Sequence, residues 1–524
     1  MTTLFDYWFS HPNVWFNATK EDDNFITENF FSEFIPPKDE KLLIQNFKLG
    51  MEYIIRYDQV PRHVARSKPE LNISPDELSL KVLPFAEKFY THHKYSFNSD
   101  EFSFVLLPLR HSKIYEKIFY VIKETTIKIR SKPKDLKIRR FLKATLERMI
   151  LQTDDSTNIN LFNPKQNCHT IIDSANICEL GLEVYRPRLL KREIAKDFTK
   201  NFKMDDLDTN KIIVSLSGGV DSMVLSYILI KLYGSSNVVA VHINYNNRKE
   251  CNDEVEIIKQ WTSFLEIPLY VRKIQELSRP ECMELELRDL YESFTRDLRY
   301  MTYINTAKLV GSRKCIVYLG HNHDDCFENI LTNIASESHY SNLNGMSHET
   351  TQNINQNEII FRRPMLSIPK SEIFTFANYC QFPHFVDSTP KWSQRGKIRD
   401  TIRPAMEMWN PKAIESFFTL SDVMTELMSI LDKAAQSYVE LIKREQKLII
   451  NKESIPERMI FKTIFDKLDL QITQKGLDSF YEKLEFIRSN FDKYNINSKN
   501  FYQLNKTTKL EWKKINNVEF EIYF

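Results

Sequence analysis

Two patterns of apolar residues divide this chain. Over the first 150 residues, apolar positions recur three and four apart, as in LLIQNFKLGMEYIIRY and KVLPFAEKFY, which is typical of helices. Residues 152–166 (QTDDSTNINLFNPKQ) are polar and have the composition of a linker. The sequence therefore predicts an all-helical domain over 1–151, followed by a linker and a basic lead-in helix over 152–205.

From Lys211 the chain alternates short apolar runs with amphipathic segments. The runs KIIVSL, NVVAVHINY, LYVRKI and KCIVYLGH predict buried strands, and the segments between them predict helices. This alternation predicts a parallel, doubly wound α/β sheet over 206–405, with its ligand at the carboxyl ends of the strands. Residues 406–524 return to a mostly helical pattern and end in a strand pair joined at Asn516-Asn517.

Composition adds limits on the class of protein. Of the 524 residues, 42% are hydrophobic and 27% are charged, as in globular proteins. No apolar stretch approaches the ~20 residues of a membrane span, and the first residues resemble neither a signal nor a transit peptide. We therefore expect a cytoplasmic protein with no membrane partner. The seven cysteines are scattered without a CxxC pair, which argues against a disulfide framework, a zinc ribbon and a thiol-based sulfur carrier.

One segment is strongly basic although the net charge is only +2. Residues 110–148 carry 13 Lys or Arg against 4 Asp or Glu. An RNA phosphate backbone would suit this charge. A solvated helix face explains it equally well.

The strand predicted at 211–216 runs into a glycine pair, in a chain with only 10 glycines. Amides of Gly218 and Gly219, together with those of the helix that follows, would form an anion site. Ser217 and Ser222 can add hydroxyl donors. Asp221 would repel bound phosphates unless a cation such as Mg²⁺ lies between them. The spacing fits neither GxxxxGK[ST] nor GxGxxG, so this is a nucleotide loop of another kind.

The sequence SGGVDS in this loop resembles the pyrophosphatase loop of PP-loop ATPases. In that family the loop grips the β and γ phosphates of ATP while the α phosphate is attacked. The resemblance implies ATP and Mg²⁺ as cofactors, with Asp221 as the metal ligand. The residues implied to bind ATP are Ser217, Gly218, Gly219, Val220, Asp221 and Ser222.

Three downstream motifs resemble those of tRNA(Ile)-lysidine synthases. HINYNNR resembles HVNHxLR, through His242, Asn244 and Arg248. ESFTRDLRYMTY resembles ExxxRxxRY, through Glu292, Arg296, Arg299 and Tyr300. LGHNHDDCFENIL resembles LGHHxDDQxETxL, through Gly320, His321, Asp324, Asp325 and Glu328. A later segment, VDSTPKWSQRGKIRDTIRP, resembles D.SN…RNxIRxxLLP through Asp387, Arg399, Ile402, Arg403 and Pro404.

The resemblance implies a ligase that forms C–N bonds. It would adenylate the C2 carbonyl of the wobble cytidine in tRNA(Ile) with a CAU anticodon, and free L-lysine would then displace AMP. Arg296 or Arg299 would meet the charge on the α phosphate. Asp325 and Glu328, three apart at a helix start, would bind the lysine ammonium, and one could take its proton.

Several assignments have alternatives. His242 is either a nucleotide ligand or a packed core histidine. Arg399 and Arg403 either contact tRNA phosphates or form ion pairs on a helix surface. A rival of the same class is a tRNA-thiolating PP-loop enzyme, disfavoured by the lack of paired cysteines. The other rival is a degenerate nucleotide- or RNA-binding scaffold, favoured by departures from the family pattern at Tyr245, Cys326 and Asn329.

The first domain resembles a helical family of unknown function, numbered 924 in domain catalogues. The matched residues are Trp8, Phe9, Trp15, Asp58, Gln59, Pro61, Arg62, Arg66, Leu107, Pro108, His111 and Ser112. The resemblance implies no chemistry. It favours a helical interaction module that could bind a protein partner, with the basic segment as a further tRNA surface.

Overall fold

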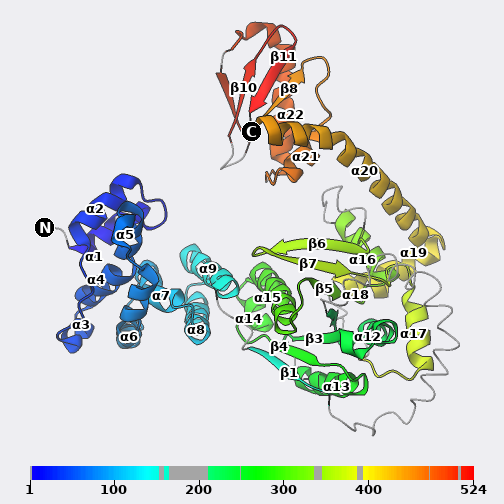
Figure 1. Cartoon of the computed structure of the whole chain (residues 1–524), viewed down its shortest axis with the longest axis horizontal. Coiled ribbons are helices and arrows are strands. Elements are labelled where there is room, and N and C mark those ends of the chain that lie inside the picture. Colours follow the sequence, from blue (N-terminus) through cyan, green and yellow to red (C-terminus); the bar gives the residue numbers. More distant parts are fainter. Residues whose placement is uncertain are drawn as a thin grey trace. The chain divides into compact units, whose positions relative to one another are not determined.

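The computed structural model in Figure 1 describes most of the chain. The described residues are 3–152, 158–164, 211–247, 250–335, 345–385, 394–470, 472–497, 499–504 and 509–523. The chain forms two compact units, one of residues 1–322 and 348–388 and the other of residues 323–347 and 389–524. The predicted lead-in helix lies outside the described residues. No described helix is both long enough and apolar enough to cross a membrane.

The N-terminal part of the first unit is all-helical, as the sequence predicts. Side chains start several of its helices: Thr19 and Asp22 form a capping box at α2, and Asn98 and Glu101 form one at α7. The helices are α1 (Leu4–Ser10), α2 (Lys20–Phe30), α3 (Glu40–Gln45), α4 (Phe47–Asp58), α5 (Val60–Ser67), α6 (Pro75–His93), α7 (Ser99–His111), α8 (Tyr115–Ser131) and α9 (Leu136–Gln152).

A seven-stranded sheet forms the other part of the first unit. Its order is β1-β4-β3-β2-β5-β7-β6, and the neighbours from β4 to β7 are parallel. The strands are β1 (Ile159–Phe162), β2 (Ile212–Ser215), β3 (Val238–Asn244), β4 (Leu269–Lys273), β5 (Cys315–Tyr318), β6 (Glu349–Ile354) and β7 (Asn357–Arg362). The doubly wound α/β fold is confirmed, with antiparallel edge strands β1 and β6 added. Strand β1 lies inside the stretch predicted as a linker, where Ile159 is buried.

Both faces of this sheet are buried, which is why its strands read as continuous apolar runs. Ile213 and Val239 face a core shared with the N-terminal helices and α15 (Arg288–Leu309). Ile212 and Val238, one residue away on each strand, face the opposite core. That second core is built with α12 (Val220–Tyr233), α13 (Cys251–Phe264) and α17 (Lys370–Tyr379), and α14 (Arg279–Glu284) precedes α15.

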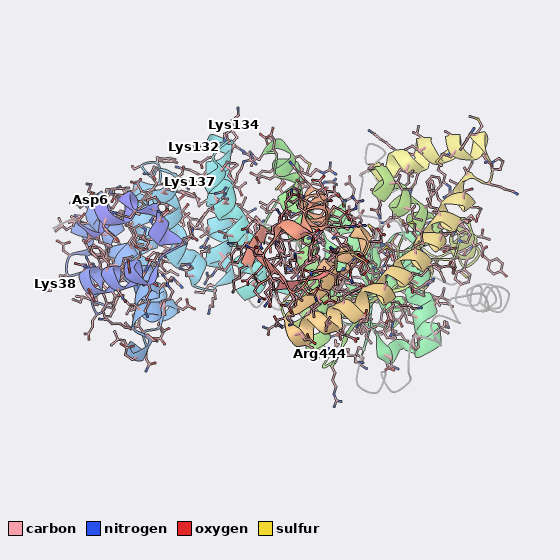
Figure 2. The ribbon with its side chains drawn as sticks, turned by 90° about the horizontal axis from the view of Figure 1, so that it is seen from above. Asp6, Lys38, Lys132, Lys134, Lys137 and Arg444 are labelled. Atoms are coloured by element: carbon pink, nitrogen blue, oxygen red, sulfur yellow. The ribbon has the colours of Figure 1, made fainter. Side chains whose placement is uncertain are left out.

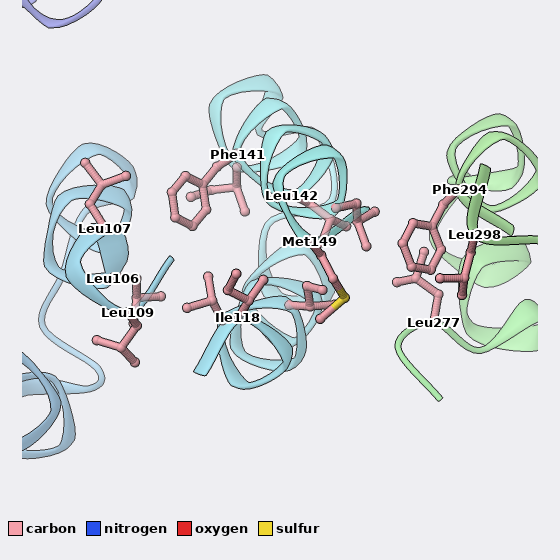
Figure 3. Close-up of a cluster of buried hydrophobic side chains, with 14 of the residues drawn as sticks. Leu106, Leu107, Leu109, Ile118, Phe141, Leu142, Met149, Leu277, Phe294 and Leu298 are labelled. Carbon is pink, nitrogen blue, oxygen red and sulfur yellow. The ribbon is translucent and has the colours of Figure 1, made fainter. Parts of the chain in front are cut away.

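The helical part and the sheet part share one apolar core (Figure 3). Met149 of α9 lies beside Leu277, Phe294 and Leu298 of the sheet part. Polar contacts surround this shared core. Lys123 Nζ donates to the carbonyl of Gln275 at 2.9 Å, Arg139 Nη2 to that of Leu285 at 2.8 Å, and Tyr115 to the Glu276 carboxylate at 2.9 Å.

The second unit contains helices and a smaller antiparallel sheet. The helices are α16 (His323–Ala335), α18 (Gln394–Lys397), α19 (Arg403–Trp409), α20 (Ala413–Glu445), α21 (Arg458–Lys467) and α22 (Gln474–Ser489), with a π-helical turn over Ile398–Ile402. The sheet order is β8-β11-β10-β9. Strands β10 (Lys509–Lys514) and β11 (Glu519–Tyr523) are the predicted pair. Strands β8 (Lys447–Asn451) and β9 (Lys499–Gln503) were not predicted, because each is a short run beside a helical segment.

Candidate active site

The glycine pair lies between the end of β2 and the start of α12, where the sequence predicts it. Gly218 has φ +83°, a left-handed conformation that favours glycine, and its carbonyl accepts from the Phe385 amide at 2.9 Å. A Cβ at Gly218 would lie 2.0 Å from the Phe385 ring. Gly219 is the N-cap of α12, so it lies at the positive end of the helix dipole, beside the amides of the first helical turn. The loop thus has the backbone geometry of an anion site.

The two serines hold the loop closed on itself. Ser222 Oγ donates to the Gly219 carbonyl at 2.9 Å and accepts from the Ser217 amide at 3.2 Å. The hydroxyls of Ser217 and Ser222 are 3.1 Å apart. Val220 is buried and anchors the first turn of α12 in the core. Ser217 is exposed, so its hydroxyl is available to a ligand.

Asp221 is the acidic group of the loop and is one-fifth exposed. One carboxylate oxygen accepts from Asn322 Nδ2 at 2.9 Å, and the other lies 3.5 Å from Lys370 Nζ. Gly320, after β5, allows its segment to approach the segment of Asp221 closely, since a Cβ there would be 3.0 Å from the Asp221 backbone. The described residues contain no cluster of three or more potential metal ligands. One carboxylate fits a Mg²⁺ ion that takes its other ligands from phosphates and water.

Arg299 and Arg296 lie on the same helix but in different surroundings. Arg296 is exposed and pairs with Asp297 at 3.2 Å. Arg299 lies over the Tyr300 ring, and its Nε is buried with no hydrogen-bond partner among the described residues. Burial would lower the pKa of Arg299, but Tyr303, Tyr245 and Tyr300 raise it above its ordinary value. Arg299 is therefore the better placed of the two to meet a developing negative charge.

His242 is a buried residue of β3. Its Nδ1 lies 2.8 Å from the Leu216 carbonyl, which ties β3 to the residue after β2. Burial lowers the pKa of His242, so the ring is neutral and Nδ1 donates this bond. The contact is a structural one, and a role at the nucleotide stays a prediction.

The predicted lysine-binding carboxylates lie on the first turns of α16, in the second unit. Asp325 and Glu328 are both buried, and Arg399 bridges them. Arg399 Nη2 is 3.2 Å from Asp325 Oδ1 and 3.2 Å from Glu328 Oε2, and its Nε donates to Glu328 Oε1. Burial raises the pKa of Glu328 above its ordinary value although Arg399 opposes the shift. The two carboxylates thus lie close together, as predicted, but the cation between them is Arg399 of the protein itself.

The two arginines predicted to contact tRNA both form ion pairs with α16. Arg403 Nη1 is 2.6 Å from Asp324 Oδ2, and its Nε is 2.9 Å from Glu407 Oε1. Arg399 lies in the π-helical turn, a local widening that is frequent at functional sites. These contacts match the second interpretation of the sequence, ion pairing, and the tRNA role stays a prediction.

The basic segment of the N-terminal part is largely used inside the first unit. Lys123, Arg130 and Arg139 contact the sheet part, and Lys117 and Lys137 pair with Glu87 and Asp100. Figure 2 shows Lys132 and Lys134 at the outer end of the turn between α8 and α9. Three of the 13 basic residues therefore join the two parts of the unit, an explanation that the sequence did not suggest.

Sequence reasoning missed three participants in the loop. Asn322 reaches Asp221 from the segment after β5, Lys370 reaches it from the start of α17, and Phe385 reaches Gly218 from the segment after α17. Asn322 could have been found, because it follows β5, the neighbour of β2, and parallel strands bring their carboxyl ends together. Arg248 and Asp387, two of the motif residues, lie outside the described residues.

Comparison with protein families identifies the helical part and the sheet part of the first unit. Residues 190–406 match the model of the PP-loop domain. Residues 4–151 match a bacterial protein family of unknown function, DUF924. The chain therefore has a DUF924 domain followed along the sequence by a PP-loop domain, as the sequence motifs indicate. The domain limits drawn from the sequence stay predictions.

Among curated proteins, the chain is similar to tRNA(Ile)-lysidine synthases. It is 30% identical over 222 residues to the one of Borreliella burgdorferi (strain ZS7), covering 42% of this chain and 48% of that protein. It is 26% identical over 292 residues to the one of Chlamydia trachomatis serovar D, covering 52% of this chain and 84% of that protein. The chain spans about half the length of the first curated relatives that it matches.

Among solved structures, the chain is similar to a U34-tRNA thiolase from Methanococcus maripaludis. The match has 18% identity and a TM-score of 0.36, and it covers 45% of this chain and 80% of that one. A TM-score of this size carries no argument about function.

Proposed function

We propose that this protein is a tRNA-modifying PP-loop ATPase of the tRNA(Ile)-lysidine synthase type. It would adenylate the C2 carbonyl of the wobble cytidine in tRNA(Ile) with a CAU anticodon and then join free L-lysine to that carbon, releasing AMP and pyrophosphate. The observation that carries the proposal is the loop around Gly218, Gly219 and Asp221, with Asn322 and Lys370 meeting at the Asp221 carboxylate. The similarity to lysidine synthases supports the choice of substrates.

The residues of the first unit would serve the adenylation step. The amides of Gly218 and Gly219 would hold the pyrophosphate leaving group, and Asp221 would hold Mg²⁺ against the same phosphates. The ion would neutralise charge that builds up on the leaving pyrophosphate. Lys370, 3.5 Å from Asp221, would add a cation at the same place. Arg299 would donate to the α phosphate, where charge develops as the cytidine oxygen attacks.

The acidic residues of the second unit would serve the lysine step. The ammonium of the incoming amino acid requires carboxylates, and Asp325 and Glu328 supply two on one helix face. Arg399 pairs with both carboxylates, and Arg395 lies 3.7 Å from Glu328. Lysine would have to share the carboxylates with these arginines, and the raised pKa of Glu328 suits it to take the proton that the attacking amine must lose.

One assay tests the proposal. Purified protein is incubated with ATP, Mg²⁺, labelled lysine and unmodified tRNA(Ile) with a CAU anticodon, and AMP and tRNA-bound label are measured. We expect both products in equal amounts. AMP without label would keep the adenylation step and overturn the lysine assignment, and the absence of both would overturn the proposal in favour of a nucleotide- or RNA-binding scaffold.

Asp221→Asn tests the role of the loop carboxylate in the same assay. We expect AMP release to fall by about 100-fold, because the leaving pyrophosphate loses its cation, while tRNA affinity stays within about twofold. Asp289→Asn is the matched control, since Asp289 is an exposed aspartate at the start of α15. Joint loss of tRNA binding and AMP release would contradict the metal role.

Cysteine burial weighs against the thiolation alternative. The five cysteines within the described residues are all buried. Burial raises the pKa of Cys282 to about 11 and that of Cys315 to about 12, which disfavours the reactive thiolate. The cytoplasmic location, ATP and Mg²⁺ belong to the same proposal.

A further inference from the structure

The DUF924 domain contains a buried polar cluster that the proposed function does not use. Asp58, at the end of α4, is fully buried and accepts three hydrogen bonds from neutral groups. The donors are Gln59 Nε2, Ser79 Oγ at 2.5 Å and His111 Nδ1 at 3.0 Å. Burial lowers the pKa of His111 to about 4, so His111 is neutral near pH 7, and the net effect on Asp58 is a lowered pKa. The cluster therefore has one buried negative charge.

Three arginines from three helices surround this charge. Arg62 of α5 lies 3.9 Å from Asp58 and donates to Ser79 at 3.1 Å. Arg110, in the last turn of α7, lies over the ring of Phe141 on α9, with its guanidinium carbon 5.0 Å from the ring centre. Arg148 is seven residues after Phe141, which places it two turns along the same face of α9. The three cations thus converge from α5, α7 and α9.

Each of these arginines has a hydrogen-bond donor that no described residue accepts. The Nε atoms of Arg62, Arg110 and Arg148 are all buried and have no hydrogen-bond partner among the described residues. A buried donor without an acceptor is costly, so it requires an explanation. Burial and the neighbouring Arg148 lower the pKa of Arg110 to about 10, which still leaves it charged near pH 7. Arg62, Arg110, Arg148 and the neighbouring Lys113 face two carboxylates, Asp58 and Asp76, which leaves two positive charges without a counter-ion.

The rim of the cluster is open to solvent. The Arg62 side chain is 24% exposed, and beside it Lys113 and Asp76 form an ion pair at 2.8 Å with about half of each side chain exposed. Lys113 adopts a left-handed backbone with φ +60°, which is uncommon for lysine and is found mostly where surrounding structure enforces it. An anion could therefore reach Arg110 past Arg62 and Lys113.

We propose that Arg62, Arg110 and Arg148 form a binding site for a phosphate monoester in the DUF924 domain. A phosphate monoester carries a charge of about −1.5 to −2 near pH 7 and three acceptor oxygens. It would match the two uncompensated charges and supply an acceptor to each orphaned Nε. Arginine suits this role because its planar donors bind phosphate in pairs. Either a small phosphorylated molecule or the 5′ end of an RNA carries this group.

Titration of the full-length protein with inorganic phosphate tests the site. We expect two classes of binding, one at the loop around Gly218 and one at the arginine cluster. Arg110→Gln and Arg148→Gln should each weaken the second class by about tenfold or more, since each removes charge-assisted hydrogen bonds. Arg140→Gln is the matched control, because Arg140 is an exposed arginine on the same helix as Arg148. It should change the affinity by less than about twofold.

Further variants separate this site from the PP-loop and from misfolding. Asp221→Asn should leave the Arg110-dependent class unchanged, so failure of the proposed function and failure of this site are distinguishable. Circular dichroism in phosphate-free buffer checks that each variant is folded, and Arg110→Lys should keep more affinity than Arg110→Gln. Equal phosphate binding by the wild type, folded Arg110→Gln and folded Arg148→Gln would overturn the proposal.

A second set of titrations identifies the source of the phosphate. A short RNA with a 5′ phosphate is compared with the same RNA ending in a 5′ hydroxyl. Preference for the phosphorylated RNA, lost in Arg110→Gln, would support the site and assign the phosphate to RNA. Binding of inorganic phosphate without that preference would support the site and assign a small phosphorylated molecule.

Discussion

Two helices of this chain begin after neighbouring strands of the same sheet, and their beginnings are built in opposite ways. Helix α12 follows β2 through Gly218 and Gly219, and its first turn leaves backbone donors for a ligand. Helix α16 follows β5 and carries Asp324, Asp325 and Glu328, whose charges are already paired with arginines. The start of α12 depends on backbone conformation, and the start of α16 depends on arginine side chains from a distant segment.

This difference teaches how each site would respond to a ligand. Anion binding at α12 uses amides that are fixed by φ angles and by the Ser217–Ser222 contacts, so little has to move. Cation binding at α16 must share the carboxylates with Arg399, whose side chain has rotatable bonds. We therefore expect the α12 site to be sensitive to shape and the α16 site to be sensitive to charge.

The largest effect is expected from a change of shape at α12. Gly218→Ala places a Cβ 2.0 Å from the Phe385 ring and forces alanine into φ +83°. We expect ATP-dependent AMP release to fall by about 100-fold or more, because the loop can no longer hold its conformation. The measurement is AMP formation with tRNA present.

Gly311→Ala and Gly219→Ala are the controls for this prediction. Gly311 also has a positive φ, +72°, but no heavy atom lies within 4 Å of a Cβ built there. A Cβ at Gly219 would lie 3.6 Å from Ser217 Oγ, so Gly219→Ala causes no clash in the protein without ligand. In this variant the added methyl group could interfere only with a bound ligand. If Gly311→Ala reduced AMP formation as much as Gly218→Ala, a general loss of stability would be the cause and the shape argument would fail.

A medium effect is expected from a change of charge at α16. Arg399→Gln leaves the buried Asp325 without its cation and leaves Glu328 with only the half-exposed Arg395, 3.7 Å away, which should lower the stability of the second unit by about 3 kcal/mol. Arg403→Gln is the comparison variant, since its partners Asp324 and Glu407 are both more exposed than Glu328, and its cost should be smaller, about 1 kcal/mol. Urea denaturation, followed by hydrogen exchange of the α16 amides, measures both.

A double variant sharpens this prediction. Glu328→Gln in the Arg399→Gln background removes the buried charge and should recover part of the lost stability. Equal losses for Arg399→Gln and Arg403→Gln would show that the buried bridge has no special weight.

The smallest effect is expected from pH. Burial raises the pKa of Glu328 above its ordinary value of 4.5. The folded protein then holds this proton more tightly than the unfolded chain, so the contribution to stability is present below 4.5 and is lost as pH rises through the folded pKa. The thermal unfolding midpoint of the wild type should rise relative to that of Glu328→Gln as pH falls from about 7 to about 4.5. A difference that does not vary with pH would contradict the raised pKa.

The sequence predicted where the loop before α12 lies, because much of its conformation is local, while its binding role stays a prediction. Ser217, Gly219 and Ser222 hold one another within six consecutive residues. The parallel sheet was equally predictable, since burial on both faces makes each strand a continuous apolar run. Strand β1 was missed because it is a four-residue edge strand inside a polar segment, with Asn160 and Leu161 exposed.

The pairing of α16 could not be predicted, because it joins Asp325 and Glu328 to a residue about 70 positions away. No periodicity connects such segments, and a basic residue alone does not show whether it faces solvent, RNA or a carboxylate. The arginine cluster of the DUF924 domain was hidden for the same reason. Arg62, Arg110 and Arg148 are far apart in the sequence, and only the packing of α5, α7 and α9 brings them together.

The apolar contact between α9 and the sheet part has a consequence for the folding of the first unit. Met149 covers Leu277, Phe294 and Leu298, and carbonyls at 275 and 285 accept from Lys123 and Arg139. A fragment cut between the two family matches would expose this surface to water and to other chains. We therefore expect the DUF924 and PP-loop domains of this chain to melt as one cooperative body, although each matches a family of its own.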